Sequence, residues 1–301
     1  MGALEELSTA VAKVAKSASP AIVGVGGRWH RGSGVIVAEN RVLTNAHNTH
    51  GDEAGVVFAD GRKALGKVLG VDVDGDLAVI EVDTAGAKAI PWADAKAAPV
   101  VGSVVFAVAS APSGGARVTV GTVSGLERSF RGPGGRAIGG SLEHTAPLAP
   151  GSSGSAVVDA TGNLVALNTQ RVGDGFYLAI PADESLRARI EALARGESPA
   201  RPKLGIAVAP SNVARHMRRA VGLPDRSGVL VRGVEEGSPA DEAGIRDGDL
   251  IVSAGGAPVE DPDQLHEALV KAGPGKLDFG LVRGAEDLTV KVDLGVGGKP
   301  N

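Results

Sequence analysis

The chain has 301 residues, which is enough for two domains of ordinary size, and its 43% hydrophobic and 22% charged residues are typical of a globular protein. Its formal net charge of −4 gives no electrostatic basis for binding nucleic acid. Cysteine is absent, which excludes disulfides, thiol nucleophiles and thiolate zinc sites.

Residues 1–20 predict an amphipathic helix. Apolar residues recur in it at helical spacing, so the helix is expected to dock on the body of the protein or on a neighbouring molecule. These residues are Leu4, Leu7, Val11 and Val14. The segment lacks the basic start and apolar core of a signal peptide, and no apolar run approaches the roughly 18 residues that a membrane-spanning helix needs. As printed, the sequence therefore predicts a soluble chain without an export signal, which on that basis is cytoplasmic.

Residues 21–196 predict a β-rich domain. Short apolar runs such as AIVGV, SGVIV, LAVIEV and SVVFAVA alternate with turn signals such as ADG, APSGG and ATGN. Many short strands without alternating helices indicate a sandwich or a barrel. The domain ends in a predicted helix over 182–196, and the polar, proline-bearing stretch 197–202 predicts a linker.

Residues 203–297 predict a small module that mixes strands with two helices. The runs LGIAVAP, GVLVRGV and DLIVSAGG are typical of strands, and LDFGLVRG with LTVKVDLG predicts a closing hairpin. SPADEAG predicts a short helix. A longer helix is expected between Asp261, a suitable N-cap, and Gly273, with Pro262 at its first position. The basic run RHMRR at 215–219 is typical of a solvated helix face.

The stretch PLAPGSSGSAVV at 147–158 is compatible with a flexible linker or with a catalytic serine on a tight turn. A linker would mark a domain boundary, whereas VVDATGNLVALN continues directly into another predicted hairpin. Ser153 is therefore placed inside the first domain, on a turn between strands. Gly151 can point its N–H, together with that of Ser153, into one pocket that would receive an oxyanion.

A serine nucleophile needs a base, and His47 is the best-placed histidine. It follows the apolar run RVLT in a small-residue turn, where an imidazole would be held at a sheet edge. His50 completes an H-x-x-H pattern, but no third ligand has recognisable spacing, so no metal site is predicted. The other histidines lack such a context and are expected on the surface or in ordinary hydrogen bonds. They are His30, His144, His216 and His266.

The segment GVDVDGDLAVIEV supplies an acid to orient the imidazole. A calcium-binding EF-hand loop would need glycine and glutamate where this chain has Leu77 and Asp83, so a calcium site is not predicted. Asp76 directly precedes the apolar run LAVI, where it can be shielded from water at the edge of the core. That position suits an acid that stays ionised beneath a histidine. Asp72 and Asp74 are expected to be exposed turn residues.

The order His47, Asp76, Ser153, carried by TNAH, DLAV and PGSSG, resembles that of the trypsin-like serine proteases. More narrowly, the chain resembles the HtrA (high-temperature-requirement) family, in which PDZ domains follow the protease domain. The matching segments are GSGVIV at 32–37, TNAH at 44–47, DLAVIEV at 76–82, GNLVALNT at 162–169, FYLAIPAD at 176–183, KLGI at 203–206 and GSPADEAGIRDGDLIVSAGGAPV at 237–259. The resemblance runs from about residue 4 to 294. It implies a mainly β fold, with a chymotrypsin-like double β-barrel protease domain followed by a small α+β PDZ domain.

The resemblance implies an ATP-independent serine endopeptidase that cleaves unfolded or damaged proteins in protein quality control and the stress response. His47 would be the general base, Asp76 its orienting acid and Ser153 the nucleophile, with the N–H groups of Gly151 and Ser153 forming the oxyanion hole. No cofactor or metal is implied. The family usually works outside the cytoplasm, as a homotrimer built through the N-terminal region. The sequence holds no phosphate-loop motif, and the glycine-rich stretch 130–140 is expected to be a mobile loop near the active site.

The serine loop departs from the family pattern. The family has G-N-S-G-G-P, whereas this chain has GSSGSA, with Ser152, Ser155 and Ala156 at the changed positions. No triad member is lost, but the changes alter the bulk and backbone stiffness beside the nucleophile. The alternative function is a catalytically weak or inactive protease-like scaffold that binds protein C-termini through its PDZ domain.

The same mapping predicts the specificity of both domains. The acid of trypsin-type pockets would fall at Pro147, so cleavage after lysine or arginine is not expected, and an apolar pocket would favour aliphatic residues. The residues expected to line that pocket are Leu167, Asn168, Thr169 and Phe176. In the PDZ domain, a C-terminal peptide would add as a strand beside LGIAV, with its carboxylate held by the N–H groups of Lys203, Leu204, Gly205 and Ile206. Leu265 and Leu269 would line the groove, or would simply be core residues.

Overall fold

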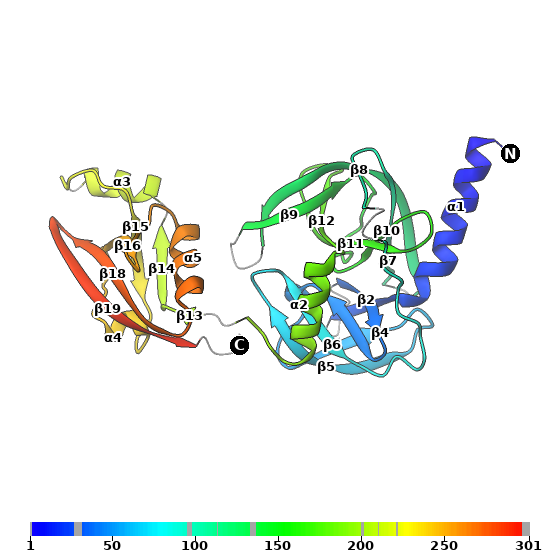
Figure 1. The fold of residues 1–301 in the computed structure, drawn as a ribbon, viewed down its shortest axis with the longest axis horizontal. Helices are drawn as coiled ribbons and strands as arrows, with labels where there is room; N and C mark the ends of the chain where they lie inside the picture. Colours follow the sequence, from blue (N-terminus) through cyan, green and yellow to red (C-terminus); the bar gives the residue numbers. More distant parts are fainter. Residues whose placement is uncertain are drawn as a thin grey trace. The chain divides into compact units, whose positions relative to one another are not determined.

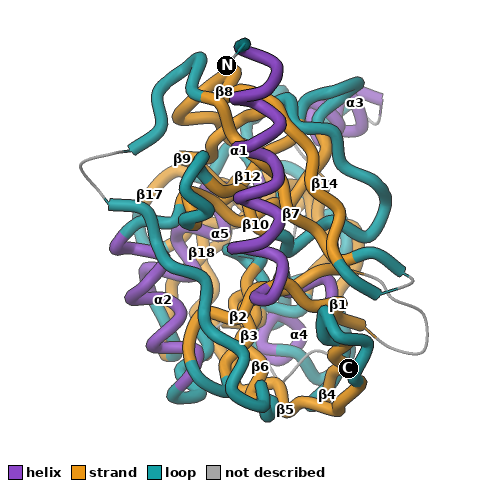
Figure 2. The backbone as a smooth tube through the Cα atoms, turned by 90° about the vertical axis from the view of Figure 1, so that its right-hand side faces the viewer, coloured by secondary structure: helices purple, strands orange, loops and turns teal. Residues whose placement is uncertain are grey.

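The computed structural model describes residues 2–26, 32–94, 98–112, 114–132, 137–199, 202–209, 211–220 and 222–296. The chain folds into two compact units, the first ending at Pro199 and the second following it (Figure 1). Strands make up most of the regular backbone in both units (Figure 2). The prediction of a mainly β protein is therefore confirmed.

The first unit contains two closed barrels of antiparallel strands. The first barrel is closed in the order β1-β2-β3-β6-β5-β4, and the second in the order β10-β11-β12-β9-β8-β7. The strands are β1 (Ile22–Gly26), β2 (Gly32–Ala38), β3 (Arg41–Thr44), β4 (Glu53–Val57), β5 (Lys63–Asp72), β6 (Leu77–Glu81), β7 (Val104–Ser110), β8 (Ala116–Arg131), β9 (Ala137–His144), β10 (Ala156–Val158), β11 (Leu164–Arg171) and β12 (Tyr177–Pro181). Apolar side chains of both barrels meet in one core cluster, which holds the two halves of the unit together. Its fully buried members include Ile22, Ile36, Leu43, Ile80, Phe106, Leu164 and Leu167.

Helices flank the barrels. The predicted N-terminal helix is α1 (Ala3–Ala18), and it packs against β7 and β8 near its C-terminal end. Val14 is fully buried there, whereas Leu4 is 80% exposed. The predicted helix over 182–196 is α2 (Glu184–Ala194), which contacts β5 and β6. The short 3₁₀ turns η1 (Ser19–Ala21) and η2 (Ala46–Asn48) complete the unit.

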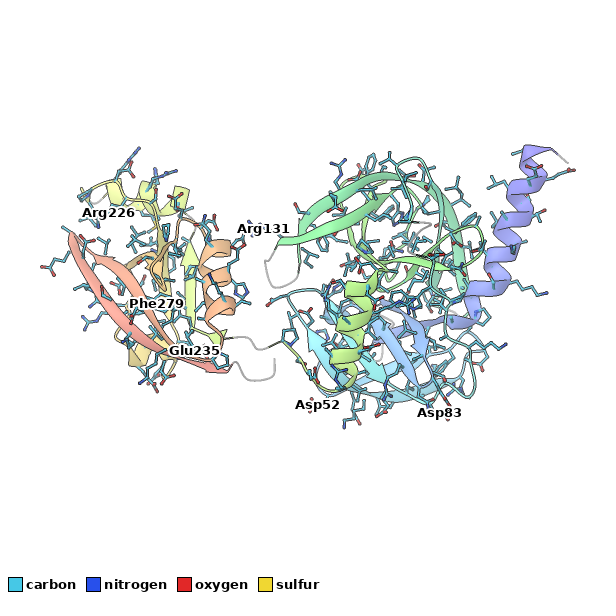
Figure 3. All side chains as sticks on the ribbon, in the orientation of Figure 1. Asp52, Asp83, Arg131, Arg226, Glu235 and Phe279 are labelled. Atoms are coloured by element: carbon cyan, nitrogen blue, oxygen red, sulfur yellow. The ribbon has the colours of Figure 1, made fainter. Side chains whose placement is uncertain are left out.

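In its described residues, the second unit is a sheet with three helices. Its strand order is β13-β19-β18-β16-β15-β14, so that β14 lies at one edge, and β17 pairs with β16. The strands are β13 (Pro202–Lys203), β14 (Ile206–Ala209), β15 (Val229–Val234), β16 (Leu250–Ala254), β17 (Ala257–Pro258), β18 (Gly275–Arg283) and β19 (Glu286–Val296), and the helices are α3 (Ser211–Ala220), α4 (Pro239–Glu242) and α5 (Pro262–Ala272). Phe279, labelled in Figure 3, is fully buried at the centre of this unit's core.

Local signals account for the helices of the second unit. Asp261 caps α5 by accepting a hydrogen bond from the backbone N–H of Gln264 (2.9 Å), and Gly273 ends the helix with φ 63°. The basic run at 215–219 lies on α3, where Arg215, His216 and Arg219 are exposed, as a solvated helix face requires. Leu265 and Leu269 belong to the core, with 4% and 6% of their surface exposed.

The glycine-rich stretch 130–140, expected to be a mobile loop, is described only at its two ends, which are largely strand. Strand β8 continues through Arg131 and β9 begins at Ala137, with Phe130 paired to Ile138, so most of the stretch is the end of a long hairpin. Residues 133–136 lie outside the described residues, as does His30.

Among the helices that the structure describes, none combines the length and hydropathy needed to cross a membrane.

Candidate active site

His47 and Asp76 lie in hydrogen-bonding contact within the first barrel. His47 is on η2, directly after β3, and its Nδ1 is 2.9 Å from Oδ1 and 3.0 Å from Oδ2 of Asp76. The backbone N–H of His47 also donates to Oδ1 (3.3 Å). Only 1% of the Asp76 side chain is exposed, against 34% of the His47 side chain. The carboxylate therefore orients the imidazole through Nδ1 and leaves its opposite edge accessible.

Two further side chains hold Asp76 in place, one through its backbone and one through its carboxylate. This residue has φ 52°, a left-handed conformation in which few non-glycine residues are found. Asn45 holds the turn by donating from Nδ2 to the backbone carbonyl of Asp76 (2.9 Å). The hydroxyl of Thr169 donates to Oδ2 (2.6 Å) from strand β11 of the other barrel. The acid is thus held by both barrels at once.

Ser153 sits on the turn before β10, and its backbone carbonyl anchors that turn to the first barrel. This carbonyl accepts from the backbone N–H of Ser33 (2.8 Å) and from Nδ2 of Asn48 (2.9 Å). The Ser153 hydroxyl donates to the carbonyl of Thr169 (3.2 Å), and in the described part of the chain no hydrogen bond joins it to His47. To give its proton to His47, the hydroxyl must first leave Thr169, and such realignment on substrate binding is common in free active sites.

The backbone around Ser153 offers two donors for an oxyanion. Gly151 has φ 85°, and neither its N–H nor that of Ser153 donates to any residue that the structure describes. Glycine is required at position 154, where φ is 82° and an added Cβ would lie 2.2 Å from the Ser33 carbonyl oxygen. The turn can therefore present two N–H groups toward a developing oxyanion.

A cavity of about 160 Å³ opens beside Ser153. Its lining residues are Leu148, Ala149, Pro150, Gly151, Ser152, Ser153, Asn168, Thr169, Gln170, Arg171 and Tyr177. Of the four residues predicted to line the pocket, Asn168 and Thr169 do so. Leu167 is instead fully buried between Ala156 and Ile180 in the barrel core, and Phe176 is 43% exposed outside the lining. Leu148 and Tyr177, which the sequence reasoning missed, supply the apolar surface in their place.

Asp72 was expected to be an exposed turn residue, but it is buried, with 8% of its surface accessible. Its Oδ2 accepts from Nη2 of Arg189 on α2 (2.7 Å), and its Oδ1 accepts from the backbone N–H of Gly75 (2.8 Å). The guanidinium lies so close over Gly75 that an added Cβ there would be 1.5 Å from Nη2. Arg189 and Asp72 thus clamp the turn that carries Asp76, and Asp74 on the same turn is half-buried.

His144, expected on the surface or in ordinary hydrogen bonds, is hydrogen-bonded, but its place beside the cavity was not predicted. It is fully buried behind the cavity, where its ring stacks on Tyr177 with 5.7 Å between centroids. Its Nε2 lies 2.7 Å from Oδ1 of Asn168, a residue of the cavity wall. No local motif marks this histidine, because its partners come from other strands. His50, in contrast, is exposed.

The second unit presents a candidate peptide site at the start of β14. Gly205 has φ 77°, and an added Cβ would lie 2.2 Å from Cβ of Ser238, so only glycine fits. The carbonyls of Leu204 and Gly205 accept from Ala240 (3.0 Å) and Glu235 (2.9 Å), whereas their N–H groups donate to no described residue. Beside this turn, β14 is an edge strand. The arrangement leaves donors and a strand edge available to an extended peptide.

Comparisons with known proteins agree with this architecture. A family model described as a trypsin-like peptidase domain matches residues 32–167, and one described as a PDZ domain matches residues 202–294. The putative serine protease HhoA of Synechocystis sp. is 33% identical over 279 residues, which are 87% of this chain and 70% of HhoA. A probable periplasmic serine endoprotease, DegP-like, of Rhizobium meliloti is 30% identical over 275 residues, 88% of this chain and 53% of that protein. The chain thus spans about half the length of the DegP-like relatives.

Solved structures show the same likeness across both units. The structure of the HtrA-type protease AlgW with a decapeptide has 25% identity and a TM-score of 0.70, with 96% of this chain and 99% of that one covered. The serine endoprotease from Yersinia pestis has 26% identity and a TM-score of 0.67, with 96% and 98% covered. The barrels, the PDZ-type sheet and these matches together establish that the chain belongs to the HtrA/DegP family of trypsin-like serine proteases with a PDZ domain.

Proposed function

We propose that this protein is an ATP-independent serine endopeptidase of HtrA type that cleaves unfolded or damaged proteins. The observation that carries the proposal is the paired geometry of His47 and Asp76, 2.9 Å apart, beside a serine turn with two N–H groups that donate to no described residue. A scaffold that only bound peptides would need neither a buried carboxylate beneath the imidazole nor these donors. Both are required for acyl transfer from a peptide bond to a serine.

The proposed reaction proceeds through an acyl-enzyme. Oγ of Ser153 attacks the carbonyl carbon of the substrate peptide bond while its proton passes to Nε2 of His47. Asp76 accepts the Nδ1–H of His47 and stabilises the imidazolium, and the N–H groups of Gly151 and Ser153 receive the oxyanion. His47 then gives the proton to the leaving amine, and a water molecule, activated in the same way, hydrolyses the ester.

The cavity beside Ser153 supports a preference for aliphatic side chains. Its volume of about 160 Å³ and its Leu148 and Tyr177 surfaces suit a side chain of small to medium size. Arg171 lies in the lining with its guanidinium paired to Asp174 (3.0 Å), and the described lining residues include no carboxylate that could bind lysine or arginine. Pro147, at the position of the trypsin-type acid, provides no compensating charge.

The second unit is proposed to hold the C-terminus of a peptide. The peptide would add as a strand to the free edge of β14, with its carboxylate on the N–H groups of the turn at Leu204 and Gly205. Assembly into a homotrimer through the N-terminal region is part of the proposal. The exposed Leu4 and Leu7 of α1, 80% and 42% accessible, are available for such a contact.

Labelling with a fluorescent fluorophosphonate tests the proposal, because this probe reacts with an activated serine. We expect the protein to be labelled, with or without an added C-terminal peptide, and Ser153→Ala to abolish the label. Ser152→Ala, on the same turn, is the matched control and should keep most of it. The hydrogen bond from Ser153 to Thr169 favours the alternative of a scaffold without catalysis. Absence of labelling under every peptide and temperature condition would support that alternative.

Replacing Arg189 with methionine is expected to lower kcat/KM about tenfold, equivalent to about 1.4 kcal/mol. The reason is that Arg189 and Asp72 hold the turn of Asp76, and loosening it misaligns the carboxylate beneath His47. Steady-state hydrolysis of a peptide substrate measures the effect. Arg195→Met is the control, because it makes the same replacement at an arginine whose ion pair with Glu197 is exposed. It should change kcat/KM less than twofold. Equal effects of the two replacements would contradict the positioning role.

A further inference from the structure

A buried chain of hydrogen bonds lies directly behind the serine turn. Nε2 of His144 is 2.7 Å from Oδ1 of Asn168, and Nδ2 of Asn168 donates to Oγ of Ser155 (2.9 Å). All three side chains are at most 1% exposed. They come from β9, β11 and the turn before β10, so the chain connects three separate parts of the second barrel.

The partners of the imidazole define its protonation. The backbone N–H of Ala146 lies 3.2 Å from Nδ1 of His144 and can only donate, so Nδ1 must be an unprotonated acceptor. The proton of the neutral ring is then on Nε2, which donates to Oδ1 of Asn168. This hydrogen bond fixes the orientation of the Asn168 amide, with Nδ2 pointing toward Ser155. A second proton on His144 would place two donors, Nδ1–H and the Ala146 N–H, against each other.

Asn168 connects His144 to the turn that carries Ser153. Its backbone carbonyl accepts from the N–H of Gly154 (2.8 Å), and its backbone N–H donates to the carbonyl of Ser155 (2.8 Å). With the side-chain bond to Ser155, three hydrogen bonds join Asn168 to the two residues that follow Ser153. The next residue, Thr169, contacts both the Ser153 hydroxyl and the Asp76 carboxylate.

We propose that neutral His144, acting through Asn168 and Ser155, is a positioning element that holds the Ser153 turn in shape, and that protonation of His144 releases it. This inference rests on the proposed function and adds a residue to it. It also accounts for Ser155, which stands where the family has glycine: the hydroxyl is the acceptor that the amide of Asn168 needs. Without it, the buried amide would have an unsatisfied donor.

The surroundings of His144 favour its neutral form. Tyr177 on β12 stacks on the ring, Asn168 on β11 bonds to it, and Val123 on β8 is its cross-strand partner. Glu143, its neighbour on β9, is engaged with Ser124 (2.9 Å) and lies within 3.9 Å of Arg128. Burial lowers the pKa of His144 from the ordinary value of 6.5, more strongly than the bond to Asn168 raises it.

Substitutions along the chain test the positioning role. At pH 8, Ser155→Ala and His144→Leu should each slow fluorophosphonate labelling about tenfold, because each leaves a buried group of Asn168 without a partner. The double variant should be no slower than the slower single variant, since both act through Asn168. His144→Gln keeps a donor toward Asn168 and should label within about threefold of the unsubstituted rate. Independent, multiplying effects of Ser155→Ala and His144→Leu would overturn the proposal.

The pH profile distinguishes positioning from a merely structural role. His144→Gln cannot be protonated, so its labelling rate relative to the unsubstituted protein should rise only at a pH below 6.5, where the lowered pKa lets folded His144 take up a proton. Taking the ratio cancels the effects of pH on the other groups, which both proteins share. His216→Gln, an exposed histidine on α3, is the control and should give a flat ratio. A flat ratio for His144→Gln would overturn the release on protonation.

Two measurements need no enzymatic activity, so they separate this inference from the proposed function. Because the folded pKa of His144 is lowered, its contribution to stability is complete above about 6.5 and is lost as the pH falls toward the folded value. The melting temperature should therefore fall more between pH 8 and pH 5 in the unsubstituted protein than in His144→Gln. Nitrogen-15 NMR of the imidazole should show the Nε2–H tautomer at pH 8. An Nδ1–H tautomer, or equal melting-temperature losses, would overturn the inference even in a protein that no probe labels.

Discussion

Replacement of His47 or Ser153 with alanine is expected to lower kcat for peptide hydrolysis by about 10⁶-fold, with little change in KM. The two residues act in one proton transfer, so removing either abolishes the activated nucleophile. Replacing both residues should consequently lower kcat no further than replacing either one alone. What remains is the rate that the two N–H donors and substrate binding sustain alone. Steady-state kinetics with a fluorogenic peptide that carries an aliphatic residue before the cleaved bond measures these rates.

Asp76→Asn provides a graded check on the same geometry, with an expected loss of about 10⁴-fold. An amide can present a donor to Nδ1 of His47 and thereby favour the wrong tautomer, although the turn itself is kept by Asn45. Ser152→Ala, which changes a side chain beside Ser153 without touching the proton path, is the control. A loss of less than about 100-fold for Ser153→Ala would show that the hydrolysis has another origin.

The sequence predicted the elements that local patterns encode. Short apolar runs between turn signals marked the strands, and Asp261, Pro262 and Gly273 marked the boundaries of α5. The positions of His47 and Asp76 beside strands were also local features, because each stands at the end or the beginning of an apolar run. The structure brings these two together, since β3 and β6 are neighbours in the first barrel.

Contacts between distant strands could not be predicted in the same way. Asp72 looked like a turn residue because its partner, Arg189, is 117 positions later on α2. Leu167 was expected in the pocket from the family resemblance, but it packs between β10 and β12 in the core. His144 showed no motif because its role depends on Asn168 from another strand. In each case the deciding neighbour comes from an element distant in the sequence, through sheet pairing or through packing between elements, which a single sequence does not encode locally.

The ion pair of Asp249 and Arg283 is predicted to be the most consequential polar contact in the PDZ unit. Asp249, 1% exposed, precedes β16, and Arg283 ends the adjacent β18. The guanidinium donates to both carboxylate oxygens, Nε to Oδ1 (2.8 Å) and Nη2 to Oδ2 (2.8 Å), and Oδ2 also accepts from the backbone N–H of Arg246 (2.8 Å). The hydrogen bond with Asp249 raises the pKa of Arg283 above its ordinary value, so the pair stays charged.

Asp249→Ala is therefore expected to lower the free energy of unfolding of the PDZ unit by about 3 kcal/mol. This is the lower end for breaking a buried pair, because the Arg283 side chain is 35% exposed and water can partly solvate it. For a unit of this size the melting temperature should fall by more than about 10 °C. Calorimetry of the full chain should show the loss in one transition only, since the two units have separate cores. Asp278→Ala breaks an exposed pair with Lys291, 3.6 Å apart, and should cost less than about 1 kcal/mol. A similar small cost for Asp249→Ala would show that packing, and not this ion pair, fixes the ends of β16 and β18.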